Sequence, residues 1–186
     1  MKRLFPIAVV GALLLGGLTA AVAWFGLPHG EPATSPRPVW TEVAWPFPSD
    51  PWGRGKAFRC NAPDCGVDVN VYLRAKLGFC DCTTGVADDD ALDRMGDLYL
   101  LGEASPLGAG REIAVGPMKG RSRAYALNNR NPMGKTTISA AFNERCDMVV
   151  ATAVLANDRP QAIEPTVIDF LNGKTVQAWA EVALGL

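Results

Sequence analysis

Residues 57–73 read AFRCNAPDCGVDVNVYL, and this stretch decides the fold class. From residue 67 to residue 74, valine or leucine at each odd position alternates with a more polar side chain at each even position. This period of two predicts a half-buried strand over 65–73. A second strand is expected at 57–60, and the Asn-Ala-Pro-Asp sequence at 61–64 is typical of a turn. The stretch therefore predicts a β-hairpin.

Beyond this hairpin, the sequence predicts more strands and segregated helices. We expect a helix that begins with the aspartates at 88–90 and ends at Gly96, and strands at 112–115, 122–127, 136–142 and 148–155. Residues 98–101 fit either a strand or a helix end. Thr166 and Asp169 resemble the capping box of a helix, and Thr175 could cap another. This order predicts an α+β fold, with an antiparallel sheet and helices packed on it.

The predicted order of elements over residues 45–186 resembles the layout of the small single-sheet domains of the Mog1/PsbP-like kind. In that superfamily an antiparallel sheet is backed by helices, and most members are not enzymes. The resemblance is one of layout, with no motif residue behind it, and it implies only the fold.

The N-terminus predicts export and a membrane attachment. Residues 4–25 are 22 consecutive uncharged positions that follow Lys2 and Arg3. About 20 apolar residues suffice for a helix that spans the hydrocarbon core. Ala21 to Ala23 could instead be a signal-peptide cleavage site, but the length favours an uncleaved anchor. Either interpretation places the following chain in the periplasm, because the basic end stays in the cytoplasm.

The chain after this segment divides into a spacer and one domain. We assign 1–27 to the anchor or signal segment, 28–39 to a proline-rich spacer and 40–186 to a single exported domain. Four large aromatic side chains fall within 13 residues at the start of the domain: Trp40, Trp45, Phe47 and Trp52. They predict either an arm that packs on its own domain or a docking segment for a partner protein.

All five cysteines lie in the part predicted to be exported, where disulfides form by default. Cys60 and Cys65 flank the predicted hairpin turn and are expected to pair. A second bridge is expected from Cys80 or Cys82 to Cys146. These two bridges would leave one free thiol.

Cys80 and Cys82 are the one group of side chains in this sequence that could react or bind a metal ion. Two thiols separated by one residue can exchange disulfides or bind Cu(I), with Met118 or Met148 as further soft ligands. Asp81 between them would raise a thiol pKa, which opposes redox catalysis. A zinc site from the four early cysteines fits poorly, because the spacings C-x4-C and C-x-C differ from those of zinc knuckles.

Charge and composition exclude several functions. The net charge of −1 gives no general attraction to nucleic acid. The one histidine, His29, falls in the spacer, which argues against Ser-His-Asp catalysis, and no phosphate-binding loop indicates a cofactor. Residues 81–103 carry a net −6 and residues 111–145 a net +5. These segments could dock charged partners or form complementary surfaces of one domain.

The sequence thus predicts a membrane-tethered periplasmic domain, stabilised by disulfides, that binds or assists another envelope protein without catalysis. The alternative is a thiol-redox or copper-handling protein that uses Cys80 and Cys82.

Overall fold

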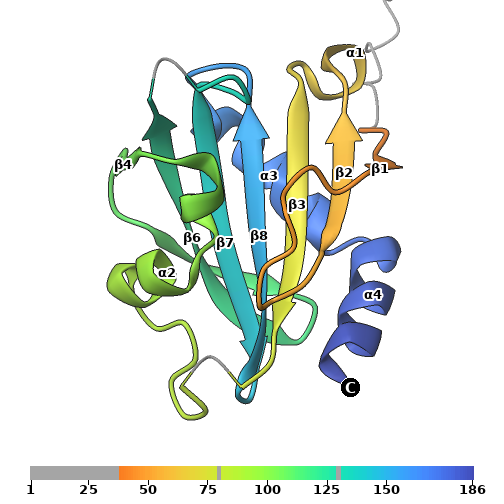
Figure 1. Cartoon of the computed structure of the whole chain (residues 1–186), viewed down its shortest axis with the longest axis vertical. Coiled ribbons are helices and arrows are strands. Elements are labelled where there is room, and N and C mark those ends of the chain that lie inside the picture. Colours follow the sequence, from red (N-terminus) through yellow and green to blue (C-terminus); the bar gives the residue numbers. More distant parts are fainter. Residues whose placement is uncertain (1–37, 79–80, 129–130) are drawn as a thin grey trace, which may run out of the picture. The chain divides into compact units, whose positions relative to one another are not determined.

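The computed structural model describes residues 38–78, 81–128 and 131–186 (Figure 1). Across these residues, eight strands form one antiparallel sheet, and four α-helices accompany it. The predicted α+β class with an antiparallel sheet is therefore confirmed. The expected hydrophobic helix at 4–25 lies outside the described residues. None of the described helices combines the length and the hydropathy that a bilayer span requires.

The sheet combines a hairpin with a three-stranded meander. Its order is β1-β2-β3-β8-β7-β6-β4, and β5 also pairs with β6. Strand β3 lies beside β8, so the N-terminal hairpin joins the meander through pairs of residues that are 72 to 86 positions apart, from Lys76 with Met148 to Val69 with Leu155. The strands are β1 (Thr41–Val43), β2 (Lys56–Cys60), β3 (Val69–Lys76), β4 (Ala104–Pro106), β5 (Arg111–Val115), β6 (Met118–Leu127), β7 (Thr136–Glu144) and β8 (Asp147–Leu155).

The predicted hairpin is present as β2 and β3, but its connection is more than a turn. Residues Ala62–Cys65 form a single helical turn, α1, with Pro63 in its first turn. Gly66 ends it at φ 74°, a conformation that glycine adopts without a Cβ penalty. Because the helical turn takes up residues 62–66, β3 begins at Val69 rather than at Cys65.

Two helices cover one face of the sheet. These are α3 (Pro160–Leu171) and α4 (Lys174–Leu184), and Figure 1 shows α3 behind the strands. The side chains of this face form the largest core cluster, which includes Val71, Phe142 and Val149 from the strands. Val176, Ala180 and Leu184 fasten α4 to the same cluster at a spacing of four residues, which keeps them on one side of the helix.

The opposite face carries α2 (Asp89–Met95), a 3-10 helix at Leu98–Leu101 and the segment 44–54. Figure 1 shows α2 in front of the sheet. The Asp88 carboxylate accepts the Ala91 N–H and Gly96 ends the helix, as the sequence predicts. The sequence allowed either a strand or a helix end at residues 98–101, and the structure shows the helical form. Since both faces are covered, the central strands are buried on both sides.

The predicted capping box at Thr166 and Asp169 is wrong. Helix α3 begins six residues earlier, at Pro160, so Thr166 lies inside it. Proline at the first helical position is favourable because its fixed φ suits the helix and no N–H is lost. A second proline, Pro165, falls within the first two turns, and this pair masked the helix in the sequence. Helix α4 similarly begins at Lys174 after Gly173, so Thr175 is not its cap.

Candidate functional site

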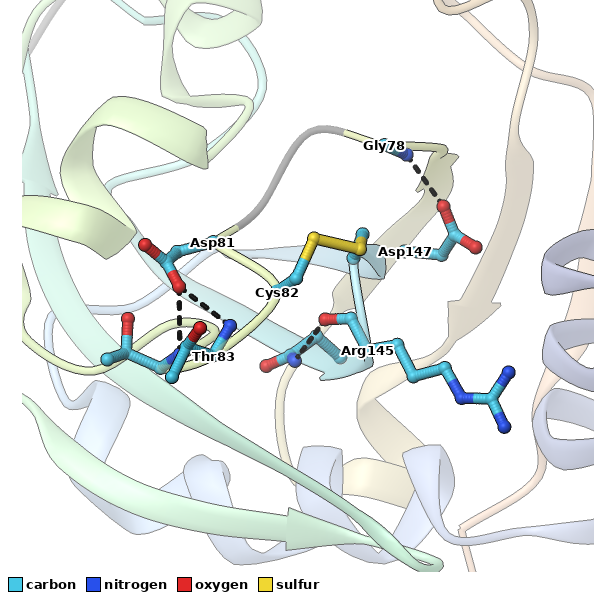
Figure 2. Close-up of a disulfide and its surroundings, with 9 residues drawn as sticks. Gly78, Asp81, Cys82, Thr83, Arg145 and Asp147 are labelled. Carbon is cyan, nitrogen blue, oxygen red and sulfur yellow. Dashed lines mark hydrogen bonds between the residues drawn. A yellow bond between two sulfur atoms is a disulfide. The ribbon is translucent and has the colours of Figure 1, made fainter.

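The two disulfides place four of the five cysteines. Cys60 pairs with Cys65 across the end of the β2–β3 hairpin, and Cys82 pairs with Cys146. Both pairings were among those that the sequence predicts, but only the structure distinguishes Cys82 from Cys80 as the partner of Cys146. Cys80 lies outside the described residues. The second bridge ties the loop before α2 to the β7–β8 turn (Figure 2).

Polar contacts hold the backbone on both sides of the Cys82–Cys146 bridge (Figure 2). The Asp81 carboxylate accepts N–H groups from Thr83 at 2.7 Å and Thr84 at 3.0 Å, and these bonds lower the pKa of Asp81. On the other side, Gly78 donates its N–H to Asp147 at 2.6 Å. Asp81 therefore shapes the turn at Cys82. Cys82 is an exposed residue, and Cys146 is partly buried.

The structure does not assemble the soft ligands proposed for copper. Met118 is buried among the residues beneath α3 and α4, and Met148 is buried on the opposite face of the sheet near α2. Across the described part of the chain, no group of three or more histidine, cysteine or carboxylate side chains is placed to hold a metal ion. Cys82, joined to Cys146, is also not a thiolate in this structure.

We call residues 40–52 the arm, and its four aromatic side chains all contact the rest of the domain. Trp40 stacks on Phe170 of α3, with 4.3 Å between ring centroids. Trp45 and Phe47 meet the Tyr72 ring edge-on at 6.0 and 4.9 Å. The Lys76 ammonium lies 5.5 Å from the Trp52 ring centroid. The contacts favour the packed-arm interpretation, and all four rings remain partly exposed. Docking of a partner on these rings stays a prediction.

A groove opens beside Trp40, and we call it the β1 groove. It has a volume of about 680 Å³, within the range of ligand sites. Trp40 and Phe170 give it an aromatic wall, and Asp64 and Asp169 add two carboxylates. Among the described residues, its lining comprises Pro38, Trp40, Asp64, Cys65, Gly66, Thr166, Asp169, Phe170, Gly173 and Thr175. The Cys60–Cys65 bridge fixes the α1 side of this groove.

A buried charge network lies under the arm, on the face opposite α3 and α4. Arg74 is 1% exposed, Lys76 2% and Asp97 3%. The Asp97 carboxylate lies 3.2 Å from Arg74 Nε and 2.9 Å from Lys76 Nζ. The Lys76 ammonium also donates to the Met95 carbonyl at 2.7 Å. One carboxylate therefore serves two buried cations.

The same network fastens the arm. Arg74 Nη1 donates to the Asp50 carboxylate and to the Tyr99 hydroxyl, and Tyr99 donates to Asp50 at 2.7 Å. Burial and the Asp50 hydrogen bond raise the pKa of Tyr99 to about 12, so it stays a donor at neutral pH. The Arg74 guanidinium also lies 5.1 Å from the Trp45 ring centroid. Arg74 therefore contacts the arm through Asp50 and Trp45, the 3-10 helix through Tyr99, and the buried carboxylate of Asp97.

Sequence reasoning missed this network. The alternation in β3 assigned Arg74 to a solvent-facing side, but the arm and the 3-10 helix cover that side. No local signal distinguishes the two cases, because a strand that is buried on both faces can show the same alternation when its polar side chains are paired.

The oppositely charged segments pair with each other in part. Asp89 of α2 accepts from Arg121 of β6, and Asp93 lies 2.9 Å from Arg123 Nη1. The Tyr125 hydroxyl donates to the same Asp93. These contacts favour complementary surfaces of one domain, the second of the two interpretations that the sequence left open.

Asp89 is expected to contribute to acid sensitivity. The Gly110 N–H and then Arg121 lower the pKa of Asp89 below its usual 3.8. A carboxylate with a lowered folded-state pKa stabilises the fold above its unfolded pKa, and the contribution is lost as the pH falls through the folded value. Urea unfolding at pH 6 and pH 3 should therefore show a smaller acid-induced loss for Asp89→Asn than for the parent. An equal loss in Asp89→Asn would contradict this assignment, and Asp90→Asn is the control.

Comparison with known proteins gave no matching family model and no matching curated relative, so the residues and their geometry carry the functional argument.

Proposed function

We propose that the protein is an envelope accessory or binding protein without catalytic activity. Residues 4–25 tether it to the inner membrane, residues 28–39 act as a spacer, and the folded domain lies in the periplasm. The observation that carries the proposal is the pair of disulfides, Cys60–Cys65 and Cys82–Cys146. Such bridges persist in oxidising compartments and are rare in a reducing cytosol.

The surface of the domain supports binding. The β1 groove has aromatic and acidic walls and opens to solvent, as sites for ligands or peptides do. The buried ionisable groups, in contrast, have a structural role. Asp97 forms ion pairs with Arg74 and Lys76, and Asp50, a second carboxylate on Arg74, holds the arm through Arg74 and Tyr99.

Fractionation of the full-length protein tests the location. We expect it in the membrane fraction, digestible by protease added from the periplasmic side, with four of its five cysteines resistant to alkylation until they are reduced. In-cell crosslinking through the domain should capture an envelope protein. A control with residues 1–27 replaced by a cleavable signal sequence should keep both disulfides but become soluble. Cytosolic protein with five reduced thiols would refute the proposal.

Thiol exchange is the second candidate, and one observation favours it. Cys82 is exposed while bridged to Cys146, and Cys80 is two residues away in the sequence. A Cys80 thiolate could attack Cys82, form a Cys80–Cys82 bond and release Cys146 as a thiolate. Mass mapping of disulfides in glutathione buffers tests this exchange. A Cys82–Cys146 bridge that resists mild reductant equally in the parent and in Cys80→Ser would exclude it.

A further inference from the structure

The β1 groove has a negative charge that the described residues leave unpaired. Asp64 and Asp169 are its charged lining residues, and within the described chain neither has an ion pair. Lys174 neighbours Thr175 in the sequence but is not part of the lining. A ligand that fills this groove gains most if it brings a positive charge, because opposite charges attract more strongly when partly shielded from water.

The aromatic wall adds a second requirement. Trp40 and Phe170 stack with an interplanar angle of 24°, and Phe170 is 9% exposed whereas Trp40 is half-buried. An apolar side chain placed against Trp40 would remove further apolar surface from water. The same ring face can also attract a cation. The groove therefore suits a group that is both cationic and partly apolar.

The strand next to the groove indicates an extended peptide. β1 follows Trp40 directly and forms an outer edge of the sheet, with β2 as its one neighbour in the described sheet. Figure 1 shows β1 at this edge, close to α1. An edge strand offers unpaired N–H and C=O groups to an added strand. Val43 pairs with Ala57 of the opposite sheet face, so Trp40 is the residue at this edge that supplies the apolar surface of the groove.

We propose that the β1 groove binds an extended segment of a partner protein that carries a lysine or arginine two residues from an apolar side chain. The backbone of this segment pairs with the free edge of β1. Alternate side chains of a strand point to the same face, so this spacing directs the cation and the apolar group to the groove together. The inference rests on the proposed binding function and names the chemistry of its partner.

A labelled hexapeptide, acetyl-Ser-Val-Ser-Lys-Ser-Val, is the probe, and fluorescence anisotropy with full-length protein in detergent is the measurement. We expect the lysine peptide to bind about two- to fivefold more tightly than a norleucine version and more tightly still than a glutamate version, in line with partly exposed ion pairs. N-methylation of alternate backbone amides should weaken binding further, because it removes the hydrogen bonds of an added strand.

Substitutions locate the site. The double variant Asp64→Asn with Asp169→Asn should bind the lysine and norleucine peptides equally, while Trp40→Leu should weaken both about tenfold. Asp158→Asn is the matched control, since Asp158 is exposed and is not among the described lining residues. Circular dichroism of each variant should match the parent. A lysine preference that survives the double variant, or tighter binding of the glutamate peptide, would overturn the proposal.

One competing occupant is the chain itself. Residues 26–37 precede Pro38, which lines the groove, and include Arg37. Replacing residues 26–37 by a glycine-serine linker of equal length should leave the affinity for the probe unchanged. An affinity that rises several-fold would show that the chain's own segment fills the groove, and would overturn a partner as the occupant. The proposed function is tested by a different experiment: it fails if fractionation finds the domain in the cytosol or if in-cell crosslinking captures no envelope protein.

Discussion

Replacing Asp97 by alanine is expected to destabilise the domain by about 3–5 kcal/mol, the usual cost of removing one partner from a buried ion pair. The change leaves Arg74 and Lys76, both almost fully buried, without their shared carboxylate. Arg74 contacts Tyr99 of the 3-10 helix and Lys76 lies against Trp52 of the arm, so both cations are covered by these segments. Chemical denaturation, followed by tryptophan fluorescence, measures the loss of unfolding free energy.

A surface ion pair provides the control for Asp97. Glu42 pairs with Lys56 at the edge of the sheet, and both side chains are 40% or more exposed. Glu42→Ala should therefore cost less than about 1 kcal/mol. If Asp97→Ala costs no more than Glu42→Ala, the buried network does not exist as described. Limited proteolysis near residue 50 should also accelerate in Asp97→Ala, because Arg74 connects the network to the arm through Asp50.

Removing the Cys82–Cys146 bridge with a double alanine variant is expected to cost about 4 kcal/mol in the chain-entropy model. The bridge spans 64 residues of sequence, so its loss frees a long loop in the unfolded chain. The Cys60–Cys65 bridge spans five residues, and the corresponding double variant should cost about 2 kcal/mol by the same relation. Thermal and urea unfolding under oxidising conditions measure both losses.

The reduced parent protein checks the origin of this stabilisation. With dithiothreitol present, both bridges of the parent and the remaining Cys60–Cys65 bridge of the Cys82→Ala/Cys146→Ala variant are reduced, so the two proteins should be equally stable. A residual difference would show that the side chains themselves, and not the covalent link, stabilise the fold. A difference below about 1 kcal/mol under oxidising conditions would contradict the entropic account.

Much of the sheet was predictable because its information is local. Period-two alternation located β3, and turn sequences separated the later strands to within a few residues of their observed ends. The aspartates before Ala91 predicted α2 because an N-cap carboxylate acts on amides only three residues away. Helix α3 was misplaced at its start because Pro165, a proline inside the helix, indicated an interruption in the sequence. Packing of Val167 and Leu171 on the sheet helps to stabilise the helix around Pro165.

The candidate site was predictable in part. The cysteine spacing indicated the Cys60–Cys65 bridge, and the aromatic residues of the arm indicated a segment that would not remain in water. The β1 groove could not be predicted, because it brings Trp40 and Asp64 against Asp169, more than 100 residues later in the chain. No pattern within a short stretch of sequence predicts that residues so far apart in the chain lie close together in the fold.

The sequence by itself determined the α+β class, the hairpin, the cysteine pair at its end and the apolar N-terminal segment, because each depends on residues a few positions apart. The tertiary structure decided that Cys146 pairs with Cys82, that Arg74 and Lys76 are buried around Asp97, and that Trp40 lines an acidic groove. The physical reason is that burial and charge pairing depend on distances in space, which strand pairing across 72 to 86 residues sets.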